Sequence, residues 1–350
     1  MLATRRRELE TCTYCPKLCR AACPVSNVEP RETLIPWGKM SNAFFLARGD
    51  VPHDAEHAAT AWACTGCMAC RERCDHENDV AGTLGDARAA SFGAGVAPAE
   101  ARRVAASFTR HAAKAARAID AIAARVPSVS ARGTPVLVGC SYARGLPDVA
   151  EHALAAAAKL VDGPVRPVRA CCGQPLRDAG DLAGFRVAQR SLEAELAGAE
   201  RVIAVDPGCA ATLRAAGERP VTLLVELAAQ SLARLQPVAS DLPLRYHDPC
   251  RLARGLGIVD EPRAVLTRIT GVRPGELPRS REKTACSGGG GQLHATMPLA
   301  SRAIARARRD EHDEAGGGEI VTACAASVLR FRKAGARASD LAAWIDRALR

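Results

Sequence analysis

The chain has 350 residues with 15 cysteines, and hydrophobic residues make up 48% of it, enough for the cores of two or three domains. The opening residues, MLATRRRELETC, contain no apolar segment, so we expect no secretory signal, and no apolar run predicts a transmembrane helix. A net charge of +10 would suit nucleic-acid binding, but aromatic residues are only 3%. A solvated basic surface, or one that docks an acidic protein partner, is the better interpretation. We therefore expect a cytoplasmic protein whose reduced cysteines are metal ligands or redox groups.

Eight cysteines fall within the first 74 residues, in two runs. The first run is Cys12, Cys15, Cys19 and Cys23, followed by proline, and the second is Cys64, Cys67, Cys70 and Cys74. The second run has the spacing of bacterial-type [4Fe–4S] ferredoxins, in which three close thiolates bind one cluster and the fourth binds the other cluster. That logic assigns one cluster to Cys64, Cys67, Cys70 and Cys23. It assigns the other cluster to Cys12, Cys15, Cys19 and Cys74.

Two features of these runs depart from the ferredoxin pattern. One extra residue separates the second and third cysteines of the first run, and Asp75-His76 stands where proline is usual. The alternative is a pair of structural zinc sites. Zinc sites usually combine two C-x2-C pairs, whereas each run here places four cysteines within eleven or twelve residues. The spacing therefore favours iron–sulfur clusters.

The cysteine-free stretch after the second run predicts a long helix. Residues 97–125 are rich in alanine, and turn residues follow at Pro127 and Gly133. We expect a two-cluster ferredoxin-like domain over 1–96 and a helical connector over 97–133. Two further units are expected over 134–240 and 241–350.

The remaining seven cysteines reveal an internal duplication. The first unit contains Cys140, Cys171, Cys172 and Cys209, and the second contains Cys250, Cys286 and Cys324. In both units 38 positions separate the first cysteine of the central motif from the last cysteine, and the last is followed by two alanines. A shared interval with shared flanks indicates a repeated structural unit.

Secondary-structure patterns agree with this repeat. We expect strands at 135–139, 201–205, 244–247 and 319–322, and helices at 148–160, 181–198, 261–270 and 298–312. Alternating strands and helices predict two α/β units with short parallel sheets behind a helical module, a mixed α+β and α/β fold. Ligands of such sheets bind outside the carboxyl ends of strands. A cysteine follows each expected strand, so each unit is expected to gather its thiols at one rim.

These motifs together resemble the cysteine-rich (CCG) domain iron–sulfur proteins. That family includes a subunit of heterodisulfide reductase, the iron–sulfur subunits of glycolate oxidase and of anaerobic glycerol-3-phosphate dehydrogenase, and the lactate-utilisation iron–sulfur protein. The segments that carry the resemblance are Cys12–Pro24, Cys64–Cys74, Ala170–Pro175, Tyr246–Cys250 and Cys286–Gly290. The resemblance implies an electron-transfer subunit that works with a flavoprotein.

The departures from the family concern its cysteines. Heterodisulfide reductase units end in a C-x2-C pair and bind an unusual [4Fe–4S] cluster at which the disulfide is cleaved, but Thr212 and Ser327 replace the last cysteine here. Ser287 also replaces the second cysteine of the central pair in the second unit. The first unit thus keeps four thiolates for a further cluster. The second unit keeps three, and it is open whether it holds a cluster.

Other candidate residues have plainer interpretations. His247 could donate a hydrogen bond to a cluster or a proton to a substrate, but closing a strand–loop corner is the favoured role. The glycines at 288–291 suggest a close backbone approach to a cluster with His294 at its periphery. His76 is expected in an exposed loop, and Trp37–Met40 is expected to pack. No dinucleotide-binding motif or paired-carboxylate site stands out, so flavin and nicotinamide are expected on a partner.

The resulting hypothesis is an electron-transfer subunit with two [4Fe–4S] clusters in its N-terminal domain and a further cluster in the first CCG unit. It relays electrons from a flavin-dependent dehydrogenase of a 2-hydroxy acid or similar metabolite to a quinone or other carrier. Contact with a membrane acceptor would come through a partner. One alternative is a catalytic reductase of disulfides, similar to heterodisulfide reductase, acting at a CCG-bound cluster. Another is a zinc-stabilised nucleic-acid module with salt-dependent binding.

Overall fold

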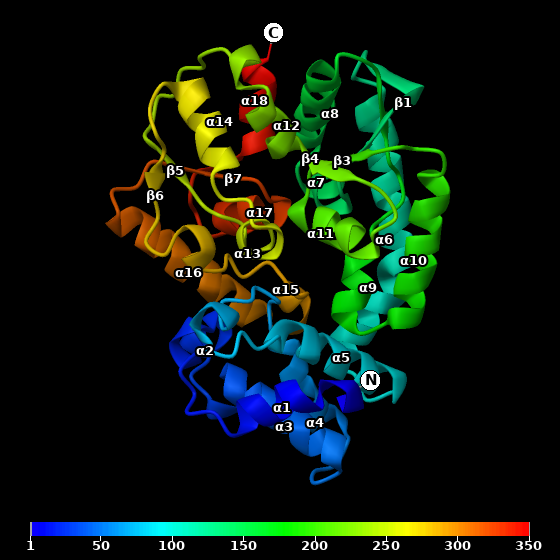
Figure 1. The fold of residues 1–350 in the computed structure, drawn as a ribbon, viewed down its shortest axis with the longest axis vertical. Coiled ribbons are helices and arrows are strands. Elements are labelled where there is room, and N and C mark those ends of the chain that lie inside the picture. Colours follow the sequence, from blue (N-terminus) through cyan, green and yellow to red (C-terminus); the bar gives the residue numbers. More distant parts are fainter. Residues whose placement is uncertain (1, 350) are drawn as a thin grey trace.

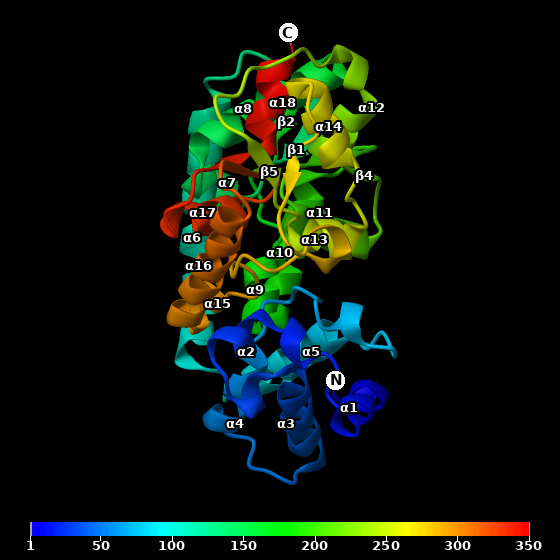
Figure 2. The ribbon, with the colours of Figure 1, turned by 90° about the vertical axis from the view of Figure 1, so that its left-hand side faces the viewer.

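The computed structural model describes residues 2–349 and shows a helical module next to two α/β units (Figure 1). The module forms one end of the molecule in both views, and the two units lie side by side at the other end in Figure 1, so that the second unit stands in front of the first in Figure 2. This arrangement confirms the predicted fold class. The exact domain boundaries remain predictions.

The N-terminal module is a small bundle around a core that includes Leu9, Met40 and Trp62. One of its two long helices, α3, begins with a proline, which suits the first helical turn, and ends before Gly49 in the left-handed region, at φ 80°. The first cysteine run extends from the last turn of α1, which contains Cys12, to the residue before α2, and the second lies between α4 and α5. The helices of the module are α1 (Arg6–Thr13), α2 (Pro24–Val28), α3 (Pro36–Arg48), α4 (Ala55–Ala59) and α5 (Val80–Gly93).

Helix α6 (Ala99–Ala123) connects the module to the first unit and confirms the predicted connector helix. Its buried residues, Ala101, Ala115, Ile119 and Ile122, lie on one side at helical spacing. The helix runs from the module along the outside of the first unit, next to α9 and α10 (Figure 1).

The first unit is a four-stranded parallel sheet in the order β2-β1-β3-β4, with helices between the strands. Strands β1 and β3 confirm two predicted strands, although β1 begins at Val129 because its early residues also pair with β2. The strands are β1 (Val129–Leu137), β2 (Val165–Pro167), β3 (Val202–Ala204) and β4 (Val221–Leu223). The helices are α7 (Cys140–Gly145), α8 (Pro147–Val161), α9 (Gln174–Ala179), α10 (Leu182–Glu195), α11 (Pro207–Ala216) and α12 (Leu224–Gln230).

The second unit repeats this topology, with a parallel sheet in the order β6-β5-β7-β8. The repeated strand order confirms the duplication inferred from the cysteines. Its strands are β5 (Leu244–Tyr246), β6 (Gly275–Glu276), β7 (Glu319–Thr322) and β8 (Ala338–Asp340). Its helices are α13 (Cys250–Leu256), α14 (Glu261–Thr270), α15 (Leu293–Thr296), α16 (Pro298–Glu314), α17 (Ala325–Lys333) and α18 (Leu341–Ala348).

The two units share one hydrophobic core, which contains Leu154 of α8 and Trp344 of α18. Helices α8 and α18 pack together, and Lys159 Nζ lies 2.9 Å from Asp346 Oδ1 across this contact. At a second contact, the hydroxyl of Tyr142 donates a hydrogen bond of 2.7 Å to Asp340. The units are therefore fixed relative to each other by packing and by buried polar contacts.

None of the helices within residues 2–349 combines the length and the apolar composition needed to span a membrane.

The buried carboxyl of Asp340 predicts a pH-dependent stability. Burial raises its pKa to about 7, although the hydrogen bond from Tyr142 opposes this shift. The folded chain then holds a proton that the unfolded chain loses near pH 4, so stability falls as the pH rises from about 4 to 7. The slope for one such group is at most about 1.4 kcal/mol for each pH unit.

We expect Asp340→Asn to remove this contribution, so the variant gains stability relative to the wild type as the pH rises. The measurement compares apparent midpoints of thermal unfolding at pH 5 and pH 7. Asp162→Asn, which changes a carboxylate 76% exposed, is the control and should show no such trend. The prediction would be contradicted if the unfolding midpoints of the wild type and Asp340→Asn differed by the same amount at pH 5 and pH 7.

Candidate iron–sulfur sites

The structure places the eight N-terminal cysteines close to one another, and the two expected groups of four are described as two sets. The outer set is Cys12, Cys15, Cys19 and Cys74, and the inner set is Cys23, Cys64, Cys67 and Cys70. Cys12 lies close enough to the other three outer cysteines for their charges to affect it. Cys70 is affected in the same way by Cys67 and Cys64, and after them by Cys19 and Cys23. Cys23 therefore lies near Cys70 of the inner set and also near Cys19 of the outer set, and the cluster that it binds stays a prediction.

Two thiols of the outer set are held as neutral groups when no metal compensates their charge. Burial, together with a smaller effect of neighbouring cysteines, raises the pKa of Cys12 to about 12 and that of Cys19 to about 11. The side-chain amide of Asn78 donates to Cys12 Sγ at 3.0 Å. Because cluster ligands are thiolates, such buried, crowded thiols suit binding to iron, which supplies the missing positive charge.

The inner set lies deeper and is surrounded by cations. The ammonium of Lys39, a side chain only 1% exposed, donates to Cys23 Sγ at 3.3 Å. Burial raises the pKa of Cys64, but the charges of Lys39 and Arg88 lower it, and the backbone N–H of Gly66 donates to its sulfur at 3.4 Å. Unit charges 4 Å apart interact by about 4 kcal/mol at an effective dielectric constant near 20. Lys39 and Arg88 therefore offset part of the effect of burial, which still raises the pKa of Cys64 and of Cys70 overall.

Both sets fit [4Fe–4S] clusters by the chemistry of their donors, four thiols with N–H groups aimed at sulfur. Among residues 2–349, no three His, Cys, Asp or Glu side chains surround a point that could hold a single metal ion. The four thiolates of a [4Fe–4S] cluster bind four separate iron atoms, so they are not expected to converge on one point.

In the first unit, four thiols meet at the carboxyl edge of the sheet. Cys140 begins α7 after β1, Cys209 lies in α11 after β3, and the pair Cys171-Cys172 precedes α9. Cys171 Sγ lies 3.8 Å from Cys140 Sγ, and Cys209 Sγ lies 3.2 Å from Cys172 Sγ. This unit therefore has a complete set of four adjacent thiols, as predicted.

Thr212, at the position of the missing family cysteine, is engaged with protein groups. Its hydroxyl lies 2.9 Å from Gln174 Oε1 and 2.9 Å from the carbonyl oxygen of Gly208. A hydroxyl held in this way has no need of a metal to satisfy its hydrogen bonds.

In the second unit, two serines occupy the positions of the missing cysteines and pair with each other. Ser287 Oγ lies 2.9 Å from Ser327 Oγ, and both residues are buried. The two hydroxyls thus satisfy each other. The three thiols that remain are Cys250 at the start of α13, Cys286 in the loop before α15 and Cys324 before α17.

The thiol of Cys286 links the second unit to the module. It interacts both with Cys250 of its own unit and with Cys67 of the inner set. Its sulfur also accepts a hydrogen bond of 3.3 Å from the backbone N–H of Gly288. The inner set and the second unit therefore contact each other through sulfur.

The rims of both units open on one cavity of about 240 Å³, instead of forming two separate sites. Ionisable side chains at its wall include Asp206, Arg251, His294 and Arg330. Its cysteines are Cys140, Cys172 and Cys209 from the first unit and Cys250, Cys286 and Cys324 from the second. The sequence predicted a rim for each unit but not their closure on a shared space.

The glycine run of the second unit packs directly on the loop of the inner set. A Cβ atom at Gly290 would lie 2.4 Å from the carbonyl oxygen of Thr65, and one at Gly291 would lie 2.2 Å from that of Cys64. The run thus allows a close backbone approach, here to the predicted cluster-binding loop. His294 is exposed and lies at the edge of the cavity, in agreement with its predicted peripheral place.

Two buried arginines reinforce this junction. Arg88 donates to the carbonyl oxygens of Cys64 at 2.5 Å and Gly291 at 3.4 Å. Arg254 donates to the carbonyl oxygens of Cys67 at 2.6 Å and Thr284 at 2.7 Å. Its Nη2 atom is buried without a hydrogen-bond partner, and the charge of its guanidinium lowers the pKa of Cys67 and of Cys250. An unpartnered cationic nitrogen at this point fits an anionic cluster.

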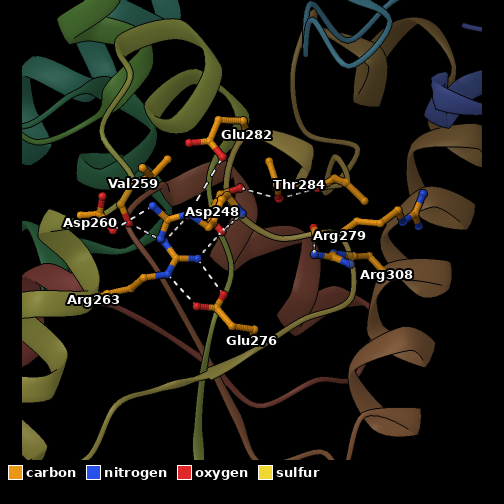
Figure 3. Close-up of polar contacts among 11 residues, drawn as sticks. Asp248, Val259, Asp260, Arg263, Glu276, Arg279, Glu282, Thr284 and Arg308 are labelled. Carbon is orange, nitrogen blue, oxygen red and sulfur yellow. Dashed lines mark hydrogen bonds and ion pairs between the residues drawn. The ribbon is translucent and has the colours of Figure 1, made fainter. Parts of the chain in front are cut away.

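A buried ion pair positions the loop that carries Cys286 (Figure 3). Asp248, 1% exposed, accepts two hydrogen bonds of 2.8 Å from Arg263, which also pairs with Glu276 at 2.7 Å. The same carboxylate accepts a hydrogen bond of 2.7 Å from the backbone N–H of Arg281. Asp248 is therefore a positioning residue that joins the start of α13 to the loop before Cys286.

His247 has the structural role that was favoured for it. Its ring is buried and packs edge-on against Phe331, with 4.8 Å between ring centres. Burial lowers its pKa well below the ordinary value, and the charges of Arg308 and Arg254 lower it further, so the ring is neutral. His76 is exposed, and Trp37 donates to the carbonyl oxygen of Thr13 at 3.0 Å, so both agree with their predicted roles.

Comparisons with known proteins agree with this geometry. Residues 8–78 match a 4Fe-4S dicluster domain, and residues 135–214 and 244–329 each match a cysteine-rich domain. The fold and the thiols thus define an iron–sulfur protein with a ferredoxin-like module and a duplicated cysteine-rich unit. The chain belongs to the cysteine-rich (CCG) domain iron–sulfur proteins, as its motifs predict.

Several known proteins are similar. A fumarate reductase (CoM/CoB) subunit of Methanothermobacter marburgensis is 27% identical over 91% of this chain and 66% of its own length. A dihydromethanophenazine:CoB–CoM heterodisulfide reductase subunit of Methanosarcina barkeri is 31% identical over 44% of this chain and 42% of its own length. An Hdr-like menaquinol oxidoreductase iron–sulfur subunit of Archaeoglobus fulgidus is 34% identical over 25% of this chain and 17% of its own length. The matched region thus spans just under two thirds of the first relative and less than half of the others.

The buried ion pair in Figure 3 leads to a stability prediction. Asp248→Asn removes the negative charge and leaves Arg263 with only Glu276, a change expected to destabilise the protein by about 3–5 kcal/mol. The measurement is the apparent midpoint of thermal unfolding. Asp260→Asn is the control, because it changes a carboxylate that is 76% exposed and bonded to Arg281, for which less than about 1 kcal/mol is expected. Equal decreases in the unfolding midpoint for Asp248→Asn and Asp260→Asn would show that Asp248 does not fix this loop.

Proposed function

We propose that the protein is an iron–sulfur electron-transfer subunit that passes single electrons between its N-terminal module and the cavity between its CCG units. The observation that carries the proposal is the contact between Cys67 of the inner set and Cys286 of the second unit. Together with the outer set and the cavity, this contact forms one continuous series of thiols. A series of closely spaced iron–sulfur sites suits electron transfer.

In this proposal, the outer and inner sets each hold a [4Fe–4S] cluster and the four thiols of the first unit hold a third. When bound, such clusters accept and release one electron at a time. The role of the chain is to hold the thiolates, exclude water and place cationic and N–H groups at the sulfurs. The second unit, with three thiols and the Ser287–Ser327 pair, lacks a complete set.

A partner supplies the two-electron chemistry in this proposal. A flavoprotein dehydrogenase of a 2-hydroxy acid or similar metabolite is the donor, and a quinone or other carrier is the acceptor. The relatives' names support work within a larger enzyme, because they are called subunits of reductases and of a menaquinol oxidoreductase. The chain itself shows no dinucleotide-binding glycine motif.

Disulfide reduction by the chain alone is disfavoured by the serine pair. Two hydroxyls that bond each other at 2.9 Å replace two thiolates at the cavity wall, and hydroxyls are poor ligands for iron in a sulfide cage. The test is turnover by the isolated, anaerobically purified chain with reduced viologen and a disulfide. We expect no turnover, while single-turnover oxidation of the reduced protein by a water-soluble quinone proceeds. Sustained disulfide reduction would overturn the relay proposal in favour of a catalytic reductase.

The cluster assignment in the first unit predicts a specific loss of iron. Cys140→Ser should remove about four iron atoms per chain, because a [4Fe–4S] cluster needs four thiolates, and leave the two N-terminal clusters in place. Iron and acid-labile sulfide analysis with EPR spectroscopy measures this. Thr212→Ala is the matched control at the same site and should keep all the iron, since its hydroxyl bonds protein groups. Unchanged iron in Cys140→Ser would contradict the assignment.

A further inference from the structure

We infer that the cluster of the inner set has a higher reduction potential than the cluster of the outer set, so that electrons collect at the end of the module that faces the CCG units. The inference rests on the proposed function only in assigning one cluster to each set. It follows from the charges buried around the inner set, which have no counterpart at the outer set within residues 2–349.

Lys39 is the first of these charges. It lies in α3, is 1% exposed, and its ammonium contacts Cys23 Sγ at 3.3 Å. Its charge also acts on Cys64, so it lies near two members of the inner set at once. Burying a lysine is costly unless a negative group compensates it, and the sulfur of Cys23 is its hydrogen-bond partner.

Arg88 and Arg254 are the second and third charges. Both are buried and bind the carbonyl oxygens of cysteines in the inner set, Cys64 and Cys67. In the part of the chain that the structure describes, neither arginine nor Lys39 forms an ion pair with a carboxylate. Three buried positive charges therefore surround the inner set, and an anionic cluster would be their counterion.

The outer set has a neutral environment by comparison. The side chain that donates to its sulfur is the amide of Asn78, at 3.0 Å from Cys12 Sγ. The basic residues beside Cys19 in the sequence, Lys17 and Arg20, are both partly or fully exposed and both pair with Glu32. Exposed, paired charges are screened by water and salt, so they act weakly on a cluster.

Two effects of the protein oppose each other at the inner set. Its deeper burial alone would lower the potential, because reduction adds negative charge in a less polar medium. The three unpaired cations stabilise that added charge, and the same low polarity strengthens their effect. Both sets contain buried thiols, so only the difference between their burial counts against the inner set. Three unpaired cations at the inner set, with none at the outer set among residues 2–349, therefore favour the reduced state at the inner set.

This order of reduction potentials sets the direction in which electrons move through the module. The outer set has three partly exposed cysteines, Cys15, Cys19 and Cys74, where a donor can approach. The inner set contacts Cys286 at the cavity. Electrons that enter at the outer set therefore move to a more favourable site before they reach the CCG units.

The test is a potentiometric titration of the anaerobically purified chain, followed by EPR spectroscopy of both N-terminal clusters. Lys39→Met should lower the ratio of reduced to oxidised cluster at a fixed potential at least tenfold for one cluster, a shift of 59 mV for one electron. The other cluster should not move. Lys17→Met is the control and should leave both potentials unchanged, since this lysine is partly exposed and paired with Glu32.

The variants also show which EPR signal belongs to which cluster, and a second variant covers the case in which Lys39→Met does not fold. The signal that shifts in Lys39→Met belongs to the inner set, and in the wild type it should be the one reduced first. Lys39→Arg keeps the charge and should restore the potential, and Arg254→Gln provides a second shift of the same signal if Lys39→Met does not assemble. The inference would be overturned if the EPR signal that shifts in Lys39→Met were the one reduced last in the wild type. It would also be overturned if neither reduction potential changed in a variant that keeps both clusters. Iron and sulfide for fewer than two N-terminal clusters would instead overturn the cluster assignment.

Discussion

The close contact between the loop Cys64–Met68 and the second unit is the constraint on which the rest of the molecule depends. Gly290 and Gly291 lie so near the carbonyl oxygens of this loop that no side chain fits between them. Arg88 and Arg254 bind carbonyl oxygens on both sides of the junction. The module cannot move away from the second unit without losing these buried contacts. The inner set is therefore held next to Cys286, and this is the point at which electrons pass from the module to the cavity in the proposed function.

The duplication provides a second constraint, since one topology has kept two different chemical sites. Both sheets have the same strand order and both place cysteines after their first and third strands in the chain. The first unit keeps its central pair of thiols, whereas the second has replaced two cysteines by serines that bond each other. A single substitution would have left one buried hydroxyl facing a thiol. With serine at both positions, each hydroxyl has the other as its hydrogen-bond partner. The second unit thus keeps the architecture of the cavity and a sulfur contact with the module.

Much of this architecture could be predicted from the sequence because it is encoded by local spacing. The cysteine runs, the 38-residue interval and the apolar strands indicate the module, the repeat and the parallel sheets. The edge strands β2, β4, β6 and β8 were not predicted, because no cysteine motif closely follows β4, β6 or β8 in the way that one follows the equally short β3 and β5, and because β2 ends in a proline. Lys39, Arg88 and Arg254 were missed as well, because nothing local distinguishes a buried cation from an exposed one. The shared cavity depends on packing between α8 and α18 and on the Tyr142–Asp340 contact, which join residues far apart in the chain.

The central claim is that the thiols hold iron–sulfur clusters, and the most direct measurement is the metal and sulfide content of the anaerobically purified protein. The account predicts about twelve iron atoms and twelve acid-labile sulfides per chain, from two clusters in the module and one in the first unit. On reduction, EPR spectroscopy should show interacting clusters, because the two sets of the module are adjacent. Zinc bound in place of iron, with no acid-labile sulfide, would contradict the account.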